Sequence, residues 1–167
     1  MSADCEGSVE QVHQALSDEA YWLARLADSG ADEASLDQMI VGGPSGDDGS
    51  IEVATTQVLR QDRLPGIVTQ FHCGDLCIQR EEKWGPVSQG AANATVVGSI
   101  PGAPATLSGA VVLEPVPAGG ARLEFRAAVD VRIPLVGGKV ENFIGSQLVD
   151  LLIAEQRFTT VWIKENA

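Results

Sequence analysis

The last part of the chain carries a long amphipathic pattern, which restricts the fold more than any other feature. Large apolar residues recur there at helical spacing between positions 139 and 163. A helix of that span is about 37 Å long at 1.5 Å per residue. We therefore predict one C-terminal helix that covers a whole β-sheet with its apolar face. The residues of this face are Val140, Phe143, Ile144, Leu148, Leu151, Leu152, Phe158 and Trp162.

The middle of the chain changes to a period of two, which is typical of β-strands. In residues 121–133 the odd positions from Leu123 onward are apolar, whereas Arg122, Glu124 and Arg126 hold even positions. This pattern predicts a strand with one buried and one solvated face. Residues 64–71 are ambiguous and suit a short helix with Pro65 in its first turn. The predicted strands are 34–41, 50–60, 76–84, 93–100, 105–115 and 121–133.

Two short helices are predicted before these strands. Ser8 and Gln11 have the spacing of a capping box, and Ser17 or Asp18 can cap a second helix that follows directly. Residues 1–7 precede Ser8 and show little β pattern, so we expect a first strand that is short or truncated. A sheet edge would then be less covered than usual.

Helices and strands are therefore segregated along the chain, which is the α+β arrangement. We expect one domain over residues 1–167, with a curved antiparallel sheet of about six or seven strands around the C-terminal helix. The two short helices would follow the first strand.

The charge balance is strongly acidic. The 23 Asp and Glu residues outnumber the 11 Lys and Arg residues, which gives a formal net charge of −12. This charge repels phosphate backbones and anionic headgroups, so we expect no nucleic-acid partner. The sequence contains no apolar run of membrane-spanning length and no recognisable signal peptide, so we expect a cytoplasmic protein without stable membrane insertion.

His72, Cys73 and Cys77 are the only residues that suggest a metal site. Their spacing matches no paired His or Cys ligand motif, and a second ligand pair is missing. We therefore expect neither a metal nor another cofactor. We also expect His13 to face the solvent, because Val9, Val12 and Leu16 occupy the buried side of its helix.

Several segments resemble a known family. Residues 8–22 are similar to the opening helix pair of START-like (SRPBCC) proteins, the superfamily that includes polyketide cyclases and plant Bet v 1 relatives. A narrower resemblance, over nearly the whole chain, is to the bacterial domain-of-unknown-function family 2505. It rests on the segments DRLP (62–65), GDL (74–76), EKW (82–84), PGAP (101–104), PLVGGKVE (134–141) and QRFTT (156–160).

This resemblance implies a helix-grip fold, with a cavity between the sheet and the C-terminal helix that usually holds a lipid or another apolar ligand. It brings no catalytic motif, so no catalytic residue is assigned. We accordingly predict the non-catalytic binding, carriage or sensing of a hydrophobic, lipid-like molecule. The alternatives are a cyclase or aromatase-type enzyme and an interaction subunit without a ligand.

The predicted ligand-binding residues lie on faces that should point inward. The polar residues on these faces allow two interpretations. Arg80 and Glu82 could form a charge pair inside the cavity or an exposed pair, and we favour the exposed pair. Glu155 could orient a ligand from within the pocket or lie at the margin of the helical stripe and reach solvent, and we favour the margin. Small residues such as Gly109 and Gly145 should leave room for a pocket. The full predicted set is Thr55, Gln57, Arg80, Trp84, Phe125, Ala127, Val129, Ile144, Gln147, Leu148, Leu151 and Glu155.

Overall fold

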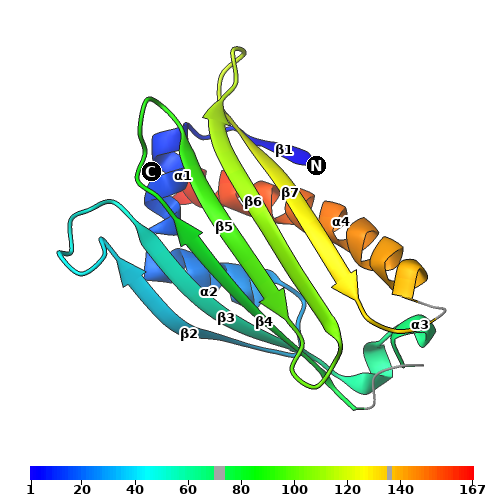
Figure 1. The fold of residues 1–167 in the computed structure, drawn as a ribbon. Helices are drawn as coiled ribbons and strands as arrows, with labels where there is room; N and C mark the ends of the chain where they lie inside the picture. Colours follow the sequence, from blue (N-terminus) through cyan, green and yellow to red (C-terminus); the bar gives the residue numbers. More distant parts are fainter. Residues whose placement is uncertain (70–73, 135–136) are drawn as a thin grey trace.

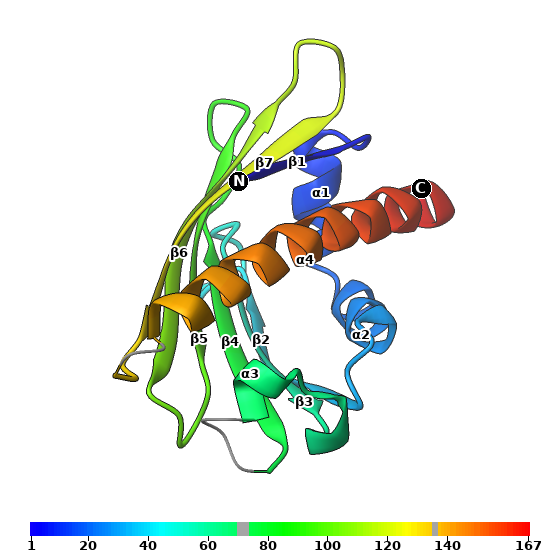
Figure 2. The ribbon, with the colours of Figure 1, turned by 90° about the vertical axis from the view of Figure 1, so that its right-hand side faces the viewer.

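The computed structural model describes residues 1–69, 74–134 and 137–167. In these residues an antiparallel sheet of seven strands curves around the long helix α4 (Gly137–Asn166) (Figure 1). Helices α1 (Val9–Leu16) and α2 (Glu19–Asp28) lie on the same side of the sheet as α4 (Figure 2). The expected α+β architecture, with a sheet wrapped around the last helix, is confirmed.

The strand order in the sheet is β1-β7-β6-β5-β4-β3-β2. All neighbours pair in antiparallel fashion, and the predicted strands from residue 34 onward are confirmed to within a few residues. Strands β4 and β6 have the predicted bounds. The strands are β1 (Ser2–Cys5), β2 (Glu33–Val41), β3 (Ile51–Leu59), β4 (Leu76–Trp84), β5 (Ala92–Ser99), β6 (Ala105–Pro115) and β7 (Ala121–Val131).

The first strand is short but present. Strand β1 pairs with β7, with Ser2 opposite Glu124 and Cys5 opposite Ala121. Four residues are too few to show an alternating pattern, which is why the β signal at the start of the sequence is weak. The pairing covers part of the β7 edge that would otherwise expose its backbone groups.

Both N-terminal caps form. The Ser8 hydroxyl accepts a hydrogen bond from the Gln11 backbone N–H at 3.1 Å, and the Gln11 side chain accepts one from the Ser8 N–H at 2.9 Å. The predicted capping box is thus confirmed. Of the two candidates for the second cap, Asp18 is used, and its carboxylate accepts from the Ala20 N–H at 2.9 Å.

The ambiguous segment 64–71 contains α3 (Gly66–Thr69), preceded by the 3₁₀ turn η1 (Gln61–Arg63). The predicted helix is confirmed over these four residues, and positions 70 and 71 lie outside the described residues. Ile67 of α3 packs against a cluster that includes Val140 at the start of α4. Helix α3 therefore borders the beginning of α4 (Figure 2).

Helix α4 begins earlier and ends later than the predicted range 139–163. At its start Gly137 donates its N–H to the Ile133 carbonyl, and a Cβ atom at Gly137 would lie 2.7 Å from the Val131 oxygen. Only glycine permits this approach of helix to strand. At its end the Asn166 side chain donates to the Trp162 carbonyl at 3.0 Å, which satisfies a terminal carbonyl and extends the helix.

The apolar side chains form two separate clusters. The larger one joins α1 and α2 to the sheet and to the second half of α4, and it includes Tyr21, Trp84 and Leu152. The smaller one contains Ala105, Val131 and Val140 at the start of α4. Helix α4 thus packs firmly near both of its ends, and the space between the two clusters contains the candidate site.

Candidate functional site

A cavity of about 590 Å³ lies between the inner face of the sheet and helix α4. Its walls include side chains from helices α1 to α4 and from strands β3 to β7. Most of them are aliphatic or aromatic, and they come from both hydrophobic clusters. The cavity therefore occupies the space between the two packed regions of the molecule.

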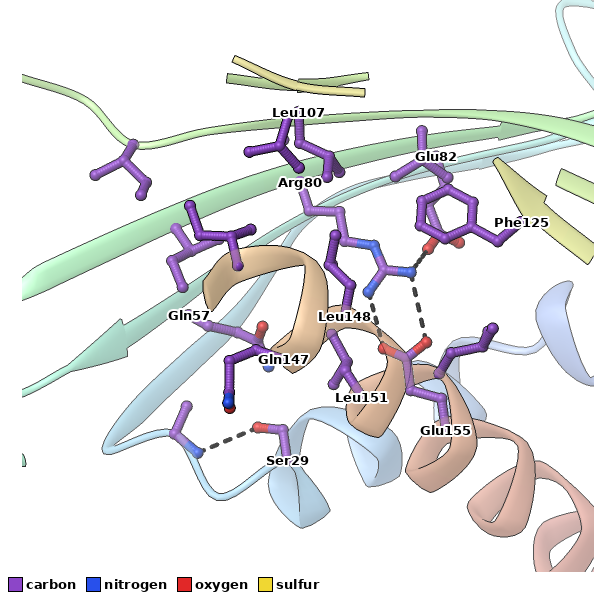
Figure 3. Close-up of a pocket in the computed structure, with 18 of the residues that line it drawn as sticks. Ser29, Gln57, Arg80, Glu82, Leu107, Phe125, Gln147, Leu148, Leu151 and Glu155 are labelled. Atoms are coloured by element: carbon purple, nitrogen blue, oxygen red, sulfur yellow. Dashed lines mark hydrogen bonds and ion pairs between the residues drawn. The ribbon is translucent and has the colours of Figure 1, made fainter. Parts of the chain in front are cut away.

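All but two of the predicted ligand-binding residues line this cavity, and Figure 3 shows seven of them with labels. The two exceptions are Thr55 and Ala127. The lining members are Gln57, Arg80, Trp84, Phe125, Val129, Ile144, Gln147, Leu148, Leu151 and Glu155.

Thr55 is buried, but it faces a separate space of about 80 Å³ beneath α2. This smaller space is bordered by Trp22, Leu26 and Phe158. Arg25, Gln57 and Arg80 border both spaces, so the smaller space adjoins the main cavity. Thr55 itself is not part of the described lining of the main cavity, so its assignment there was wrong.

Ala127 packs at the margin of the larger cluster and is absent from the described lining of the cavity, so its assignment was also wrong. It pairs with Gly109 of β6, and the Phe125 ring lies so close over Gly109 that a Cβ atom there would clash with it. The ring therefore fills the space that these small residues leave. Gly109 and Gly145 likewise do not line the cavity, whereas Ala105, another small residue of β6, does.

Four charged side chains meet inside the cavity. Arg80 and Glu82 project from the same face of β4, Glu155 comes from α4, and Arg25 comes from the last turn of α2. Glu155 forms an ion pair with Arg25 at 2.5 Å and a second one with Arg80 at 2.8 Å, and Figure 3 shows the second. Glu82 pairs with Arg80 and lies 3.9 Å from Arg25. We call these four residues the Arg–Glu cluster.

The exposed interpretations of the Arg80–Glu82 pair and of Glu155 were wrong. The side chain of Glu82 is 5% exposed and that of Glu155 is 14% exposed, because each finds a guanidinium partner that compensates its burial. Sequence reasoning missed Arg25 altogether. Its position on the same helical face as Tyr21, Trp22 and Leu26 was the available signal, since a lone arginine on a buried face needs a partner.

Neighbouring groups fix the orientation of the cluster. The Trp84 indole N–H donates to Glu82 at 3.2 Å, and Arg25 donates to the Tyr21 hydroxyl at 3.4 Å while its guanidinium stacks 4.7 Å from the centre of the Trp22 ring. Thr159 donates its hydroxyl to the Glu155 carbonyl, so the Tyr21 hydroxyl, 2.7 Å away, donates to Thr159. The hydrogen bonds thus continue from the cluster into the larger hydrophobic core.

The ion pairs control the ionisation of the cluster. Burial opposes the charge on Glu155, but the attraction of Arg25 and Arg80 outweighs it and lowers the pKa of Glu155 to about 2. Burial also opposes the charges on the two arginines, and the attraction of Glu155 again outweighs it, so that their pKa values are raised. Glu155 therefore remains ionised at neutral pH and is a poor general base.

Other candidate residues can also be placed. His13 is half-buried, and its Nε2–H donates to the Gly85 carbonyl at 3.0 Å, so the expectation that it faces the solvent was wrong. Its hydrogen bond attaches α1 to the end of β4. His72 and Cys73 lie outside the described residues, and Cys77 is half-buried on β4. Among the described residues, no group of three His, Cys, Asp or Glu side chains could hold a metal ion.

Comparison with solved structures identifies the class of fold. The chain resembles TTHA0849 from Thermus thermophilus with a TM-score of 0.63 and 11% identity, over 100% of this chain and 97% of that one. It resembles Ara h 8.0201 with a TM-score of 0.54 and 10% identity, over 99% and 96%. A conserved protein from Geobacillus kaustophilus matches with a TM-score of 0.54 and 12% identity, over 98% and 93%. The protein thus has the Bet v 1-like helix-grip fold.

Sequence comparison then identifies the family. Residues 1–163 match the model of the family described as "Protein of unknown function (DUF2505)", and the chain belongs to that family. Uncharacterized proteins of Mycobacterium bovis and Mycobacterium tuberculosis are each 54% identical to it over 167 residues, which cover 99% of this chain and 96% of theirs. The resemblance expected from the sequence motifs is therefore confirmed.

The described part of the chain contains no helix with the length and apolar character that crossing a membrane requires.

Proposed function

We propose that this protein binds a hydrophobic, lipid-like small molecule in the cavity between the sheet and α4, and that it carries or senses this molecule without transforming it. The observation that carries the proposal is the cavity of about 590 Å³ with its largely apolar lining. This volume lies within the usual range of small-molecule sites. The helix-grip fold supports the proposal, because internal cavities for apolar ligands are common in that superfamily.

The side chains of α4 add support. Ile144, Leu148 and Leu151 belong to the apolar face of the helix, yet they are only half-buried because they border the cavity. Covering a large aliphatic side chain completely contributes about 1.5–3 kcal/mol, so covering the remaining exposed part contributes about 1 kcal/mol for each. An apolar ligand would supply this contact.

We assign the orientation of the ligand to polar groups on the cavity wall. The Arg–Glu cluster lies on one part of the wall, and the amides of Gln57 and Gln147 lie elsewhere on it. A few fixed polar groups within an apolar lining are the usual means by which such sites orient a ligand. The aromatic rings of Trp84 and Phe125 would contact the apolar body.

The experiment is titration with an apolar fluorescent probe, together with native mass spectrometry and extraction of any bound molecule. We expect binding at a stoichiometry of one to one. Leu148→Trp should occupy part of the cavity and weaken probe binding while the protein still unfolds cooperatively. The matched control is Val149→Trp, because Val149 is the adjacent residue of α4 and is 40% exposed on the surface.

If the wild-type protein ignores every apolar probe, or if Leu148→Trp binds as the wild type does, the proposed function is wrong. The interaction subunit without a ligand would then be the better hypothesis.

A further inference from the structure

We infer that the cavity selects amphiphiles whose polar end is uncharged, such as alcohols, ketones, esters or amides, and that it excludes carboxylates such as free fatty acids at neutral pH. This inference rests on the proposed function and specifies the class of ligand. Two properties of the lining carry it: the pairing of its charges, and the polar atoms that remain available beside them.

Every positive charge on the described lining already has a carboxylate partner. The described lining residues include three arginines and neither lysine nor histidine. Arg25 and Arg80 pair with Glu155 and Glu82 in the Arg–Glu cluster. Arg63, in η1, pairs with Asp32 at 2.8 Å. The Arg–Glu cluster has two positive and two negative charges, so it offers no net charge to an anion.

An anionic ligand would therefore enter without compensation. Its carboxylate would lose its hydration in an apolar space and would lie near Glu82 and Glu155, which carry the same charge. Binding to Arg80 would make a third carboxylate share the two guanidinium groups that Glu82 and Glu155 already share, so one buried carboxylate would lose part of its compensation. The net charge of −12 on the whole chain adds to this repulsion.

Uncharged polar groups meet no such obstacle. The amides of Gln57 and Gln147 line the cavity, and each amide supplies both a hydrogen-bond donor and an acceptor. A hydroxyl, carbonyl or amide can use such groups without bringing a charge.

The test compares ligands that differ only at the polar end. A medium-chain fatty alcohol, its methyl ester and the corresponding fatty acid would each displace the apolar probe, at neutral pH and below the concentrations at which they form micelles. We expect the alcohol and the ester to bind at least about tenfold more tightly than the acid. Acidifying the solution toward the pKa of the fatty acid should reduce this difference.

A charge variant tests whether the Arg–Glu cluster causes the selectivity. Glu82→Gln leaves the cluster with a net positive charge, and we expect it to raise the affinity for the fatty acid, relative to that for the alcohol, about tenfold. Glu81→Gln is the matched control, because Glu81 is the adjacent, exposed residue of β4 and its replacement changes the total charge equally. This control should retain the wild-type preference.

Each outcome has a distinct meaning. If the wild-type protein binds the acid as tightly as the alcohol, the inference is overturned while the proposed function stands, and this comparison holds even if Glu82→Gln fails to fold. If Glu82→Gln folds and prefers the alcohol as strongly as Glu81→Gln does, the cluster is not the cause and the inference is overturned. If neither the probe nor any of the three ligands binds, the proposed function itself fails.

Discussion

Arg25 and Glu155 form a 2.5 Å ion pair that connects α2 to α4 inside the protein. The side chains are only 11% and 14% exposed, so water contributes little to either charge. Because Arg80 shares the same carboxylate, Glu155 neutralises groups from two other elements at once. This relationship makes Glu155 the residue on which both the stability of the cluster and its response to pH depend.

We predict that Glu155→Gln destabilises the protein by about 3–5 kcal/mol, because two buried arginines lose their shared partner. Chemical denaturation followed by tryptophan fluorescence would measure the change. The control is Glu165→Gln at the exposed end of the same helix, which should alter the free energy of unfolding by no more than about 0.5 kcal/mol. Equal unfolding midpoints for the two variants would contradict the prediction.

The lowered pKa of Glu155 predicts a loss of stability in acid. The pKa is about 2 in the folded protein, against an ordinary value of 4.5, so the unfolded chain takes up this proton first as the pH falls. The contribution is complete above pH 4.5 and is lost as the pH falls toward 2; it amounts to about 3 kcal/mol. Unfolding measured across this range should show a weaker acid dependence in Glu155→Gln. Parallel curves for the variant and the wild type would refute the assignment.

A substitution at Gly109 should disturb Phe125. A Cβ atom at this position would clash with the ring, so Gly109→Ala must move the ring toward the cavity, and we expect a destabilisation of about 1–3 kcal/mol. Ser108→Ala, on the exposed face of the same strand, is the control. In combination with Phe125→Leu the effect of Gly109→Ala should become smaller. Strictly additive effects in this double-mutant cycle would show that the two residues do not interact.

Phe158→Asp should prevent cooperative folding. The Phe158 ring lies 5.8 Å from Tyr21 and stacks on Trp162, so an aspartate would place an unpaired charge among aromatic side chains. Val161→Asp introduces the same charge on the same helix where the side chain is 51% exposed, and it should fold normally. Circular dichroism during thermal unfolding would distinguish the two variants, because only Val161→Asp should show a cooperative transition. A cooperative transition in Phe158→Asp near that of the wild type would disprove the role of these aromatic contacts.

The fold could be predicted well because most elements carry their own signal. Apolar and polar residues alternate over the whole length of strand β7, and the apolar stripe of α4 repeats over many turns. Each pattern is long enough that one atypical residue does not obscure it. The short strand β1 has no such repeat, and its pairing with β7 depends on backbone groups that every residue has.

The site was harder to predict because its charges come from three elements. The burial of Arg80 and Glu155 depends on Arg25, which lies on a different helix, and no pattern within β4 or α4 reveals that partner. Charged residues are usually exposed unless they have a buried partner. Because the sequence pattern of a single strand or helix shows no such partner, it favoured exposure for Arg80 and Glu155. The size of the side chains did not locate the cavity either. We expected open space at Gly109, but the ring of Phe125 covers that glycine.

The separation of the two hydrophobic clusters bears on how the binding properties of this fold can diverge. Val140 at the start of α4 and Leu152 farther along are buried members of the two clusters, whereas Leu148 and Leu151 between them are half-buried along the cavity and belong to neither cluster. Substitutions at these bordering positions can change the shape of the cavity without removing either packed region. Under the proposed function, changes on one side of one helix could therefore alter which ligands such proteins accept while the architecture is inherited intact.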